Sequence, residues 1–173
     1  MPMRTIIESH HKSLTFQGSD ERLRRHRTRR VMEYSVVKDA LKNCPLFQGL
    51  GESSMAYLFW RAEEATSVRY TVIYAEGTAC DDSFGLLLRG KLDFIQRGTT
   101  IRSADKIYVF GDVGYLEKDK MRTATVQVAS ASATYLLFRI DREELNRDPL
   151  KELRRRLTTE AFDKFVEDQE RTI

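Results

Sequence analysis

The spacing of apolar residues divides the chain into three stretches. Before Arg61 and after Asp141 apolar residues recur at helical spacing, whereas between these points they alternate with polar residues or form short runs. The pattern predicts helices at 35–41, 53–60, 142–146 and 149–157, and a final helix from 158 or 159 onward. Thr158 or Thr159 is expected to cap this final helix, and Trp60, at the end of the second helix, is expected in the core.

The middle stretch predicts short β-strands. Its runs are rich in β-branched and aromatic residues, and turn residues, glycine above all, separate them. The two runs on either side of Arg89-Gly90 are expected to pair as a hairpin. The expected strands cover 66–74, 84–88, 92–95, 106–110, 123–128 and 133–140. Helices on both sides of such strands predict an α+β fold, built as a compact antiparallel β-roll flanked by N-terminal and C-terminal helices.

Composition fits one domain with a basic arm. The chain has 173 residues, of which 41% are apolar and 32% charged, enough apolar material for one core. Its net charge of +3 is local, because six arginines stand close together: Arg22, Arg24, Arg25, Arg27, Arg29 and Arg30. We therefore expect a basic, partly ordered arm or helix at 1–34 and the domain at 35–173.

Several interpretations of the basic arm remain open. It is a solvated arm, or it docks to an acidic protein partner, or it is attracted without specificity to nucleic acid or anionic lipid. The absence of interleaved aromatic residues argues against nucleic acid.

The sequence also indicates a compartment. The N-terminus has no apolar signal core, and no stretch approaches the ~20 apolar residues of a membrane span. The two cysteines, Cys44 and Cys80, have no CxxC spacing, which fits reduced thiols. We expect an intracellular, cytoplasmic protein without a membrane span.

Enzymatic chemistry finds little support. All three histidines, His10, His11 and His26, lie in the arm, so the roll has no imidazole for a metal site or a catalytic triad. We expect no enzyme activity, no metal and no bound cofactor.

One segment carries chemistry suited to a phosphate ester. Gly111 lets backbone amides approach an anion, and the guanidinium of Arg122 pairs with phosphate in two-pronged geometry. A carboxylate such as Asp112 accepts hydrogen bonds from a ribose hydroxyl. The segment runs Phe-Gly-Asp-Val-Gly-Tyr-Leu from Phe110 and then Met-Arg-Thr-Ala-Thr-Val from Met121.

This segment resembles the phosphate-binding cassette of the cyclic nucleotide-binding domains. The resemblance extends to Cys44-Pro-Leu-Phe-Gln-Gly-Leu50, to the glycine-punctuated stretch 74–90 and to 137–144, and it covers roughly 35–157. It implies a β-roll that binds a cyclic nucleotide and signals through its C-terminal helices. An effector protein would contact the basic arm or the last helix.

The resemblance also assigns roles to individual residues. Arg122 would hold the phosphate and Asp112 the ribose, while Thr123 tilts the expected preference toward cGMP over cAMP. The residues expected at the ligand are Gly111, Asp112, Val113, Gly114, Arg122 and Thr123, with Phe162 and Phe165 as a lid.

Alternatives stay open at these positions. Arg122 and Asp112 can instead form a structural ion pair in an empty roll, and Tyr115 can fill the pocket. Phe162 and Phe165 can simply bury the last helix against the roll. The second hypothesis is therefore a degenerate domain that binds no cyclic nucleotide and acts as a protein-interaction module. A third keeps the pocket and changes the ligand, for instance to a nucleoside.

Overall fold

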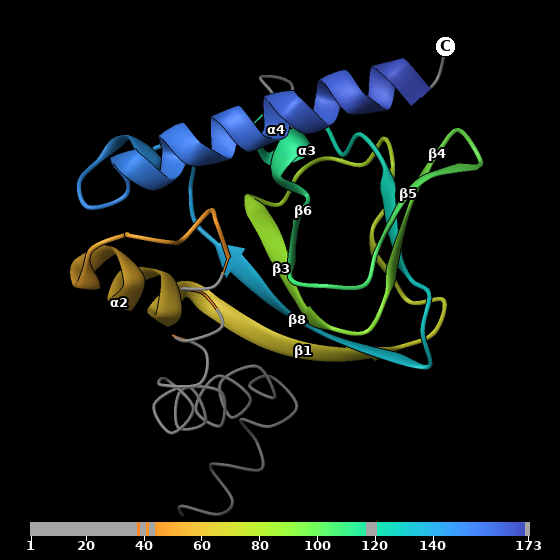
Figure 1. Ribbon diagram of the computed structural model, residues 1–173, viewed down its shortest axis with the longest axis horizontal. Helices are drawn as coiled ribbons and strands as arrows, with labels where there is room; N and C mark the ends of the chain where they lie inside the picture. The colour runs from red at the N-terminus through yellow and green to blue at the C-terminus, as the bar shows by residue number, and fades with distance from the viewer. Residues whose placement is uncertain (1–37, 39–40, 42–43, 117–120, 172–173) are drawn as a thin grey trace, which may run out of the picture. The chain divides into compact units, whose positions relative to one another are not determined.

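The computed structural model describes residues 38, 41, 44–116 and 121–171 (Figure 1). The expected arm at 1–34 and most of the expected helix at 35–41 lie outside the described residues. In chain order the elements are α2 (Glu52–Arg61), β1 (Ala62–Val68), β2 (Val72–Tyr74), β3 (Ser83–Arg89), β4 (Leu92–Gln96), β5 (Thr99–Ala104), β6 (Tyr108–Phe110), α3 (Asp112–Leu116), β7 (Thr125–Val128), β8 (Ser132–Arg139), the 3-10 turn η1 (Glu144–Asn146) and α4 (Lys151–Arg171).

The strands of the described part form two four-stranded antiparallel sheets. Their orders are β1-β8-β3-β6 and β2-β7-β4-β5. The two sheets face each other as a roll, and α4 crosses one end of it above α3 (Figure 1). The predicted α+β class and antiparallel β-roll are confirmed.

The expected hairpin at Arg89-Gly90 is wrong. Strand β3 pairs with β6 and β8, whereas β4 pairs with β5 and β7, so the chain changes sheet between them. Gly90 has a φ of +94°, and a Cβ there would lie 2.5 Å from the carbonyl oxygen of Ser132. The adjacent pair in the second sheet is β4–β5, joined at Arg97 and Gly98, whose φ values of 52° and 77° are both positive, as in a tight hairpin turn.

The single strand expected at 66–74 is also wrong, because it is two strands in different sheets. Tyr70, with a φ of 70°, stands between β1 and β2. Its amide donates to the carbonyl of Val128 at 2.9 Å, which holds the bend against the end of β7.

The core lies between the sheets. Phe110 packs so close to Gly85 that a Cβ on Gly85 would lie 2.1 Å from the ring, so the strand needs glycine there. Trp60 is 56% exposed, and the expectation that it lies in the core is wrong. Helix α2 buries the preceding positions on its other face, Met55, Leu58 and Phe59.

The C-terminal stretch is one continuous helix, α4, and the expected break at Thr158 or Thr159 is wrong. Their hydroxyls donate to the carbonyls of Arg154 and Arg155 at 2.8 and 3.1 Å, one turn earlier, instead of capping a new helix. No described helix has both the length and the apolar character to cross a membrane.

Candidate functional site

A cavity opens where the second sheet meets the β6–α3 turn and α4. Its volume is about 50 Å³, which is room for a few water molecules. A small-molecule pocket usually measures ~300–1,000 Å³. The structure brings all six residues expected at the ligand to this cavity: Gly111, Asp112, Val113, Gly114, Arg122 and Thr123.

Gly111 makes the turn between β6 and α3, and a second glycine, Gly114, stands inside α3. Gly111 has a φ of +72°, and a Cβ there would lie 2.5 Å from the ring of Tyr74. A Cβ on Gly114 would lie 2.8 Å from the carbonyl oxygen of Met121. The turn therefore requires glycine at position 111, and α3 leaves little room for a side chain at position 114.

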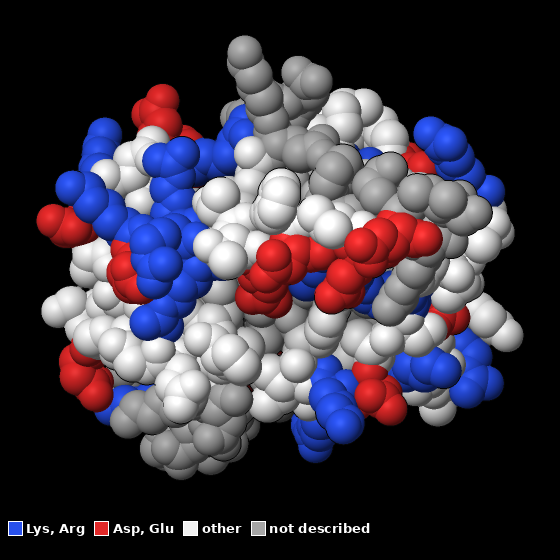
Figure 2. Space-filling view, turned by 45° about the horizontal axis from the view of Figure 1, so that its top comes forward, with Lys and Arg blue, Asp and Glu red and all other residues white. Residues whose placement is uncertain are grey.

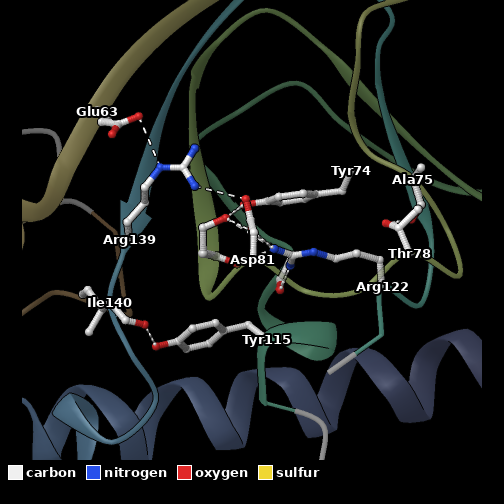
Figure 3. Close-up of polar contacts among 11 residues, drawn as sticks. Glu63, Tyr74, Ala75, Thr78, Asp81, Tyr115, Arg122, Arg139 and Ile140 are labelled. Carbon is white, nitrogen blue, oxygen red and sulfur yellow. Dashed lines mark hydrogen bonds and ion pairs between the residues drawn. The ribbon is translucent and has the colours of Figure 1, made fainter. Parts of the chain in front are cut away.

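Arg122 is held firmly at the cavity wall (Figure 3). The residue is 4% exposed. Its guanidinium donates to Gly111 O at 2.9 Å, to Asp81 Oδ1 at 2.7 Å and to Ser83 O at 2.7 Å. It also lies 3.6 Å from the ring centroid of Tyr74, whose pKa burial raises to about 12, so a cation stacks on a neutral phenol. Arg122 is thus a buried cation with a fixed orientation.

Asp81 supplies the countercharge and connects the site to the roll's outer surface. It accepts from Arg122 on one oxygen and from Arg139 at 3.1 Å on the other, and Arg139 in turn contacts Glu63 at 3.4 Å (Figure 3). Burial by itself raises the pKa of Asp81, but hydrogen bonds from Ser83, Arg122 and Arg139 outweigh it and lower that pKa below its usual value. Asp81 therefore stays ionised beside Arg122.

Asp112 pairs with Lys164 of α4, so the alternative of an ion pair between Arg122 and Asp112 is wrong. Asp112 is 2% exposed, and both its oxygens accept from Lys164 Nζ, at 3.0 and 3.1 Å. Lys164 also donates to Val109 O at 2.6 Å and lies 4.4 Å from the ring centroid of Tyr108. Burial lowers the pKa of Lys164, but the negative charge of Asp112 and other neighbours outweighs it and raises that pKa above its usual value. Lys164 is therefore a buried, charged side chain.

Tyr115 does not fill the pocket, as one interpretation of the sequence expected. Its ring packs 5.2 Å from that of Phe84, and its hydroxyl donates to Ile140 O at 2.6 Å (Figure 3). Tyr115 is not among the residues that line the cavity. Lys164, by contrast, is among the residues that line the cavity.

The remaining predicted residues lie as follows. Thr123 lines the cavity, and its carbonyl accepts from Gln96 Nε2 at 3.2 Å. Phe162 is 65% exposed, so the expectation that it buries α4 against the roll is wrong; its role as a lid stays a prediction. The side chain of Phe165 lies outside the described part of the structure.

Sequence reasoning missed Asp81 and Lys164. Lys164 carries a signal, because it continues the series Leu153, Leu157 and Ala161 that turns toward the roll, and a lysine in a buried helical stripe is unusual. Asp81 has only a weak signal, an acidic pair with Asp82 just before the apolar run of β3.

Solved structures with the same arrangement are cyclic nucleotide-binding domains. One, from Methylobacillus flagellatus, matches with a TM-score of 0.62 and 20% identity over 77% of this chain and 78% of that chain. The cAMP-bound PfPKA-R matches with a TM-score of 0.62 and 18% sequence identity, over 78% of this chain and 46% of that chain. The chain has the cyclic nucleotide-binding fold. A third structure with this fold is the regulatory subunit of a cAMP-independent protein kinase A from Trypanosoma cruzi, bound to guanosine. It matches with a TM-score of 0.56 and 19% sequence identity, over 66% of this chain and 40% of that chain.

These identities are low, so the likeness is one of fold. The chain spans less than half the length of PfPKA-R and of the Trypanosoma cruzi subunit. No protein-family model matches the sequence, and no curated protein matches it.

Proposed function

We propose that the chain is a sensor domain for a cyclic nucleotide, cGMP or cAMP, and that its C-terminal helix responds to the ligand. The observation that carries the proposal is the buried guanidinium of Arg122, held beside the Gly111 turn in this fold. A buried cation with a preset orientation favours an anion that binds in two-pronged geometry. The cAMP bound to PfPKA-R, which has the same fold, supports the ligand class.

The neighbouring residues divide the ligand between them. The phosphate binds at Arg122 and the turn amides of Gly111, Val113 and Gly114. The ribose hydroxyl donates to Asp112, and the base lies toward Thr123, whose hydroxyl favours cGMP. Because the cavity of about 50 Å³ is too small for a nucleotide, binding requires α4 to move, and this movement is the signal.

The test is calorimetric titration of the protein with cGMP, cAMP and guanosine. We expect saturable binding of a cyclic nucleotide, with cGMP tighter than cAMP. The Arg122→Lys variant keeps the charge but loses the forked geometry. It should weaken cyclic nucleotide binding at least about tenfold, since a hydrogen bond to a charged group contributes about 1.5–3 kcal/mol.

Two comparisons separate this result from a general loss of structure. Guanosine has no phosphate, so its affinity should not change in Arg122→Lys. Arg89→Lys, at the exposed end of β3, is the matched control and should bind every ligand as the wild type does. Equal cGMP affinity in Arg122→Lys and wild type would remove Arg122 from the phosphate site.

A second candidate function is a protein-interaction module that binds no cyclic nucleotide. The small cavity favours it, as does the apolar pair Phe162 and Val166, exposed to 65% and 38% on α4. It predicts neither heat nor thermal stabilisation with any of the three ligands. It also predicts that an effector protein loses affinity when residues 1–34 are deleted or when Phe162 and Val166 are made polar. Guanosine binding without cyclic nucleotide binding would instead support a nucleoside sensor.

A further inference from the structure

The two halves of α4 are attached to the roll by different forces. The first half begins beside Leu150 and buries leucines that are 0–1% exposed: Leu150, Leu153 and Leu157. After Ala161 the described apolar side chains, Phe162 and Val166, are exposed to 65% and 38%. Apolar burial therefore fixes the first half, and among the described side chains it contributes little to the second.

Among the side chains that the structure describes, polar contacts hold the second half. Lys164 bonds Asp112 and Val109 O, and Glu167 accepts from Arg102 Nη2 of β5 at 3.0 Å. The Glu167–Arg102 pair is partly exposed and contributes little, because such pairs are screened by solvent. Lys164, with a side chain 10% exposed, is the buried attachment.

The acidic residues in the second half of α4 also interact unfavourably with the helix dipole. Figure 2 shows acidic side chains in a stripe across the middle of the molecule and basic side chains gathered to the left of it. The exposed charged residues of the first half of α4 are of both signs, because Glu152 in the first turn pairs with Arg155 and Arg156. The exposed charged residues described in the second half are acidic: Asp163, Glu167 and Glu170. Anions near a helix C-terminus are unfavourable, so Glu167 and Glu170 do not stabilise the second half through the helix dipole, and its contacts with the roll matter more.

Lys164 is at the same time part of the cavity wall. It occupies both oxygens of Asp112, the carboxylate that a ribose hydroxyl would bind, and it lines the space of about 50 Å³. Because Asp112 is 2% exposed and Lys164 lines the same cavity, a ligand that reaches the carboxylate competes with the ammonium group for the space beside it. Displacing the ammonium group also frees the buried attachment of the second half of α4.

We propose that Lys164 competes with the ligand for Asp112, so that binding releases the second half of α4 from the roll. The proposal rests on the proposed function, since it concerns the same site. Lys164 is then a gating residue, because a ligand must offer Asp112 a hydroxyl donor in place of the ammonium group. The ligand's apparent affinity is its intrinsic affinity multiplied by the fraction of molecules in which Lys164 has released Asp112.

The first arm of the test needs no ligand. Hydrogen exchange of backbone amides is measured along α4 in wild type, Lys164→Met and Lys151→Met, the last being an exposed lysine of the same helix as the matched control. In Lys164→Met we expect protection at 162–171 to fall at least about tenfold while 151–158 keeps its protection. If Lys164→Met unfolds, Lys164→Gln keeps a donor for Val109 O and gives the same comparison. Unchanged exchange at 162–171 in the folded variant would overturn the proposal.

The second arm titrates the same proteins with cGMP and cAMP. We expect Lys164→Met to bind about tenfold more tightly than wild type and Lys151→Met to bind like wild type. Exchange at 162–171 should rise in wild type when the nucleotide is added. Equal affinities of wild type and Lys164→Met, or tighter protection of 162–171 with nucleotide, would overturn the competition while the proposed function survives. If Lys164→Met binds the nucleotide and wild type does not, the result supports both the proposed function and the competition. If neither protein binds it, both are refuted.

Discussion

At the scale of single residues, the site depends on how two buried cations are neutralised. Arg122 is neutralised by Asp81, which is half exposed, and Lys164 by Asp112, which is buried. A buried charge is costly unless it is paired and hydrogen-bonded, and both cations meet this condition. The difference in exposure matters, because Asp81 can reorient toward solvent with little penalty when an anion approaches Arg122, whereas Asp112 cannot.

The Asp81 contact predicts a stability difference that depends on pH. Asp81→Asn should lower the free energy of unfolding at pH 7 by about 1–2 kcal/mol, because Arg122 loses a charge-assisted hydrogen bond. The folded-state pKa of Asp81 lies below the usual value of ~3.9, so the carboxylate's contribution is complete above that value and is lost as the pH falls through the folded-state pKa.

Urea titrations of wild type and Asp81→Asn from pH 7 down to about pH 3 measure this difference. It should be constant at neutral pH and shrink only in the acid range below ~4. A difference that disappears between pH 7 and pH 5 would mean that another group is responsible.

The residue scale also marks the limit of what the sequence predicts. The resemblance carried by Gly111, Asp112 and Arg122 predicted residues that the structure brings to one cavity, and their roles at a ligand stay predictions. The partners of these residues could not be predicted, because Asp81 and Lys164 are 41 and 52 positions away from the groups they neutralise. Such pairing depends on strand order and on the position of α4, which local patterns do not encode.

At the scale of elements, α4 is the part of the fold best suited to respond to a ligand. Its first half is held by leucines in the core, and among the described side chains its second half is held by charge pairs. A ligand can exchange polar contacts at low net cost, whereas removing buried leucines would cost several kcal/mol.

Two substitutions in α4 test this division. Leu157→Ala should lower the free energy of unfolding by about 2–5 kcal/mol, as expected for a fully buried leucine. Phe162→Ala should change it by no more than about 0.5 kcal/mol, because the ring is exposed. Denaturant unfolding of both variants gives the values. A large loss of stability in Phe162→Ala would show that the second half is packed through apolar contacts.

Periodicity predicted most elements but not all of their partners. It indicated the helix at Glu52–Arg61 and most strands, because their apolar positions repeat clearly. It missed β5, whose sequence Thr-Thr-Ile-Arg-Ser-Ala is mostly polar because the strand lies at the edge of its sheet. It also mistook a change of sheet at Gly90 for a hairpin, since both connections need a glycine with positive φ.

At the scale of the whole molecule, the site joins every layer of the fold. Asp81 and Ser83 come from the start of β3 in one sheet, Tyr74 and Thr123 from β2 and the approach to β7 in the other, and Lys164 from α4. A ligand bound there contacts both sheets and the helix across their end. Its binding energy is therefore available to change the position of α4 relative to the roll.

The measurement that tests the central claim most directly is the ³¹P NMR spectrum of cGMP bound to the wild-type protein and to Arg122→Lys. The phosphorus resonance reports on the environment of the phosphate itself. We predict a bound resonance that is displaced from the free position in wild type and that returns toward it in Arg122→Lys at saturating protein. A bound resonance at the same position in both proteins, or no bound resonance in wild type, would contradict the account.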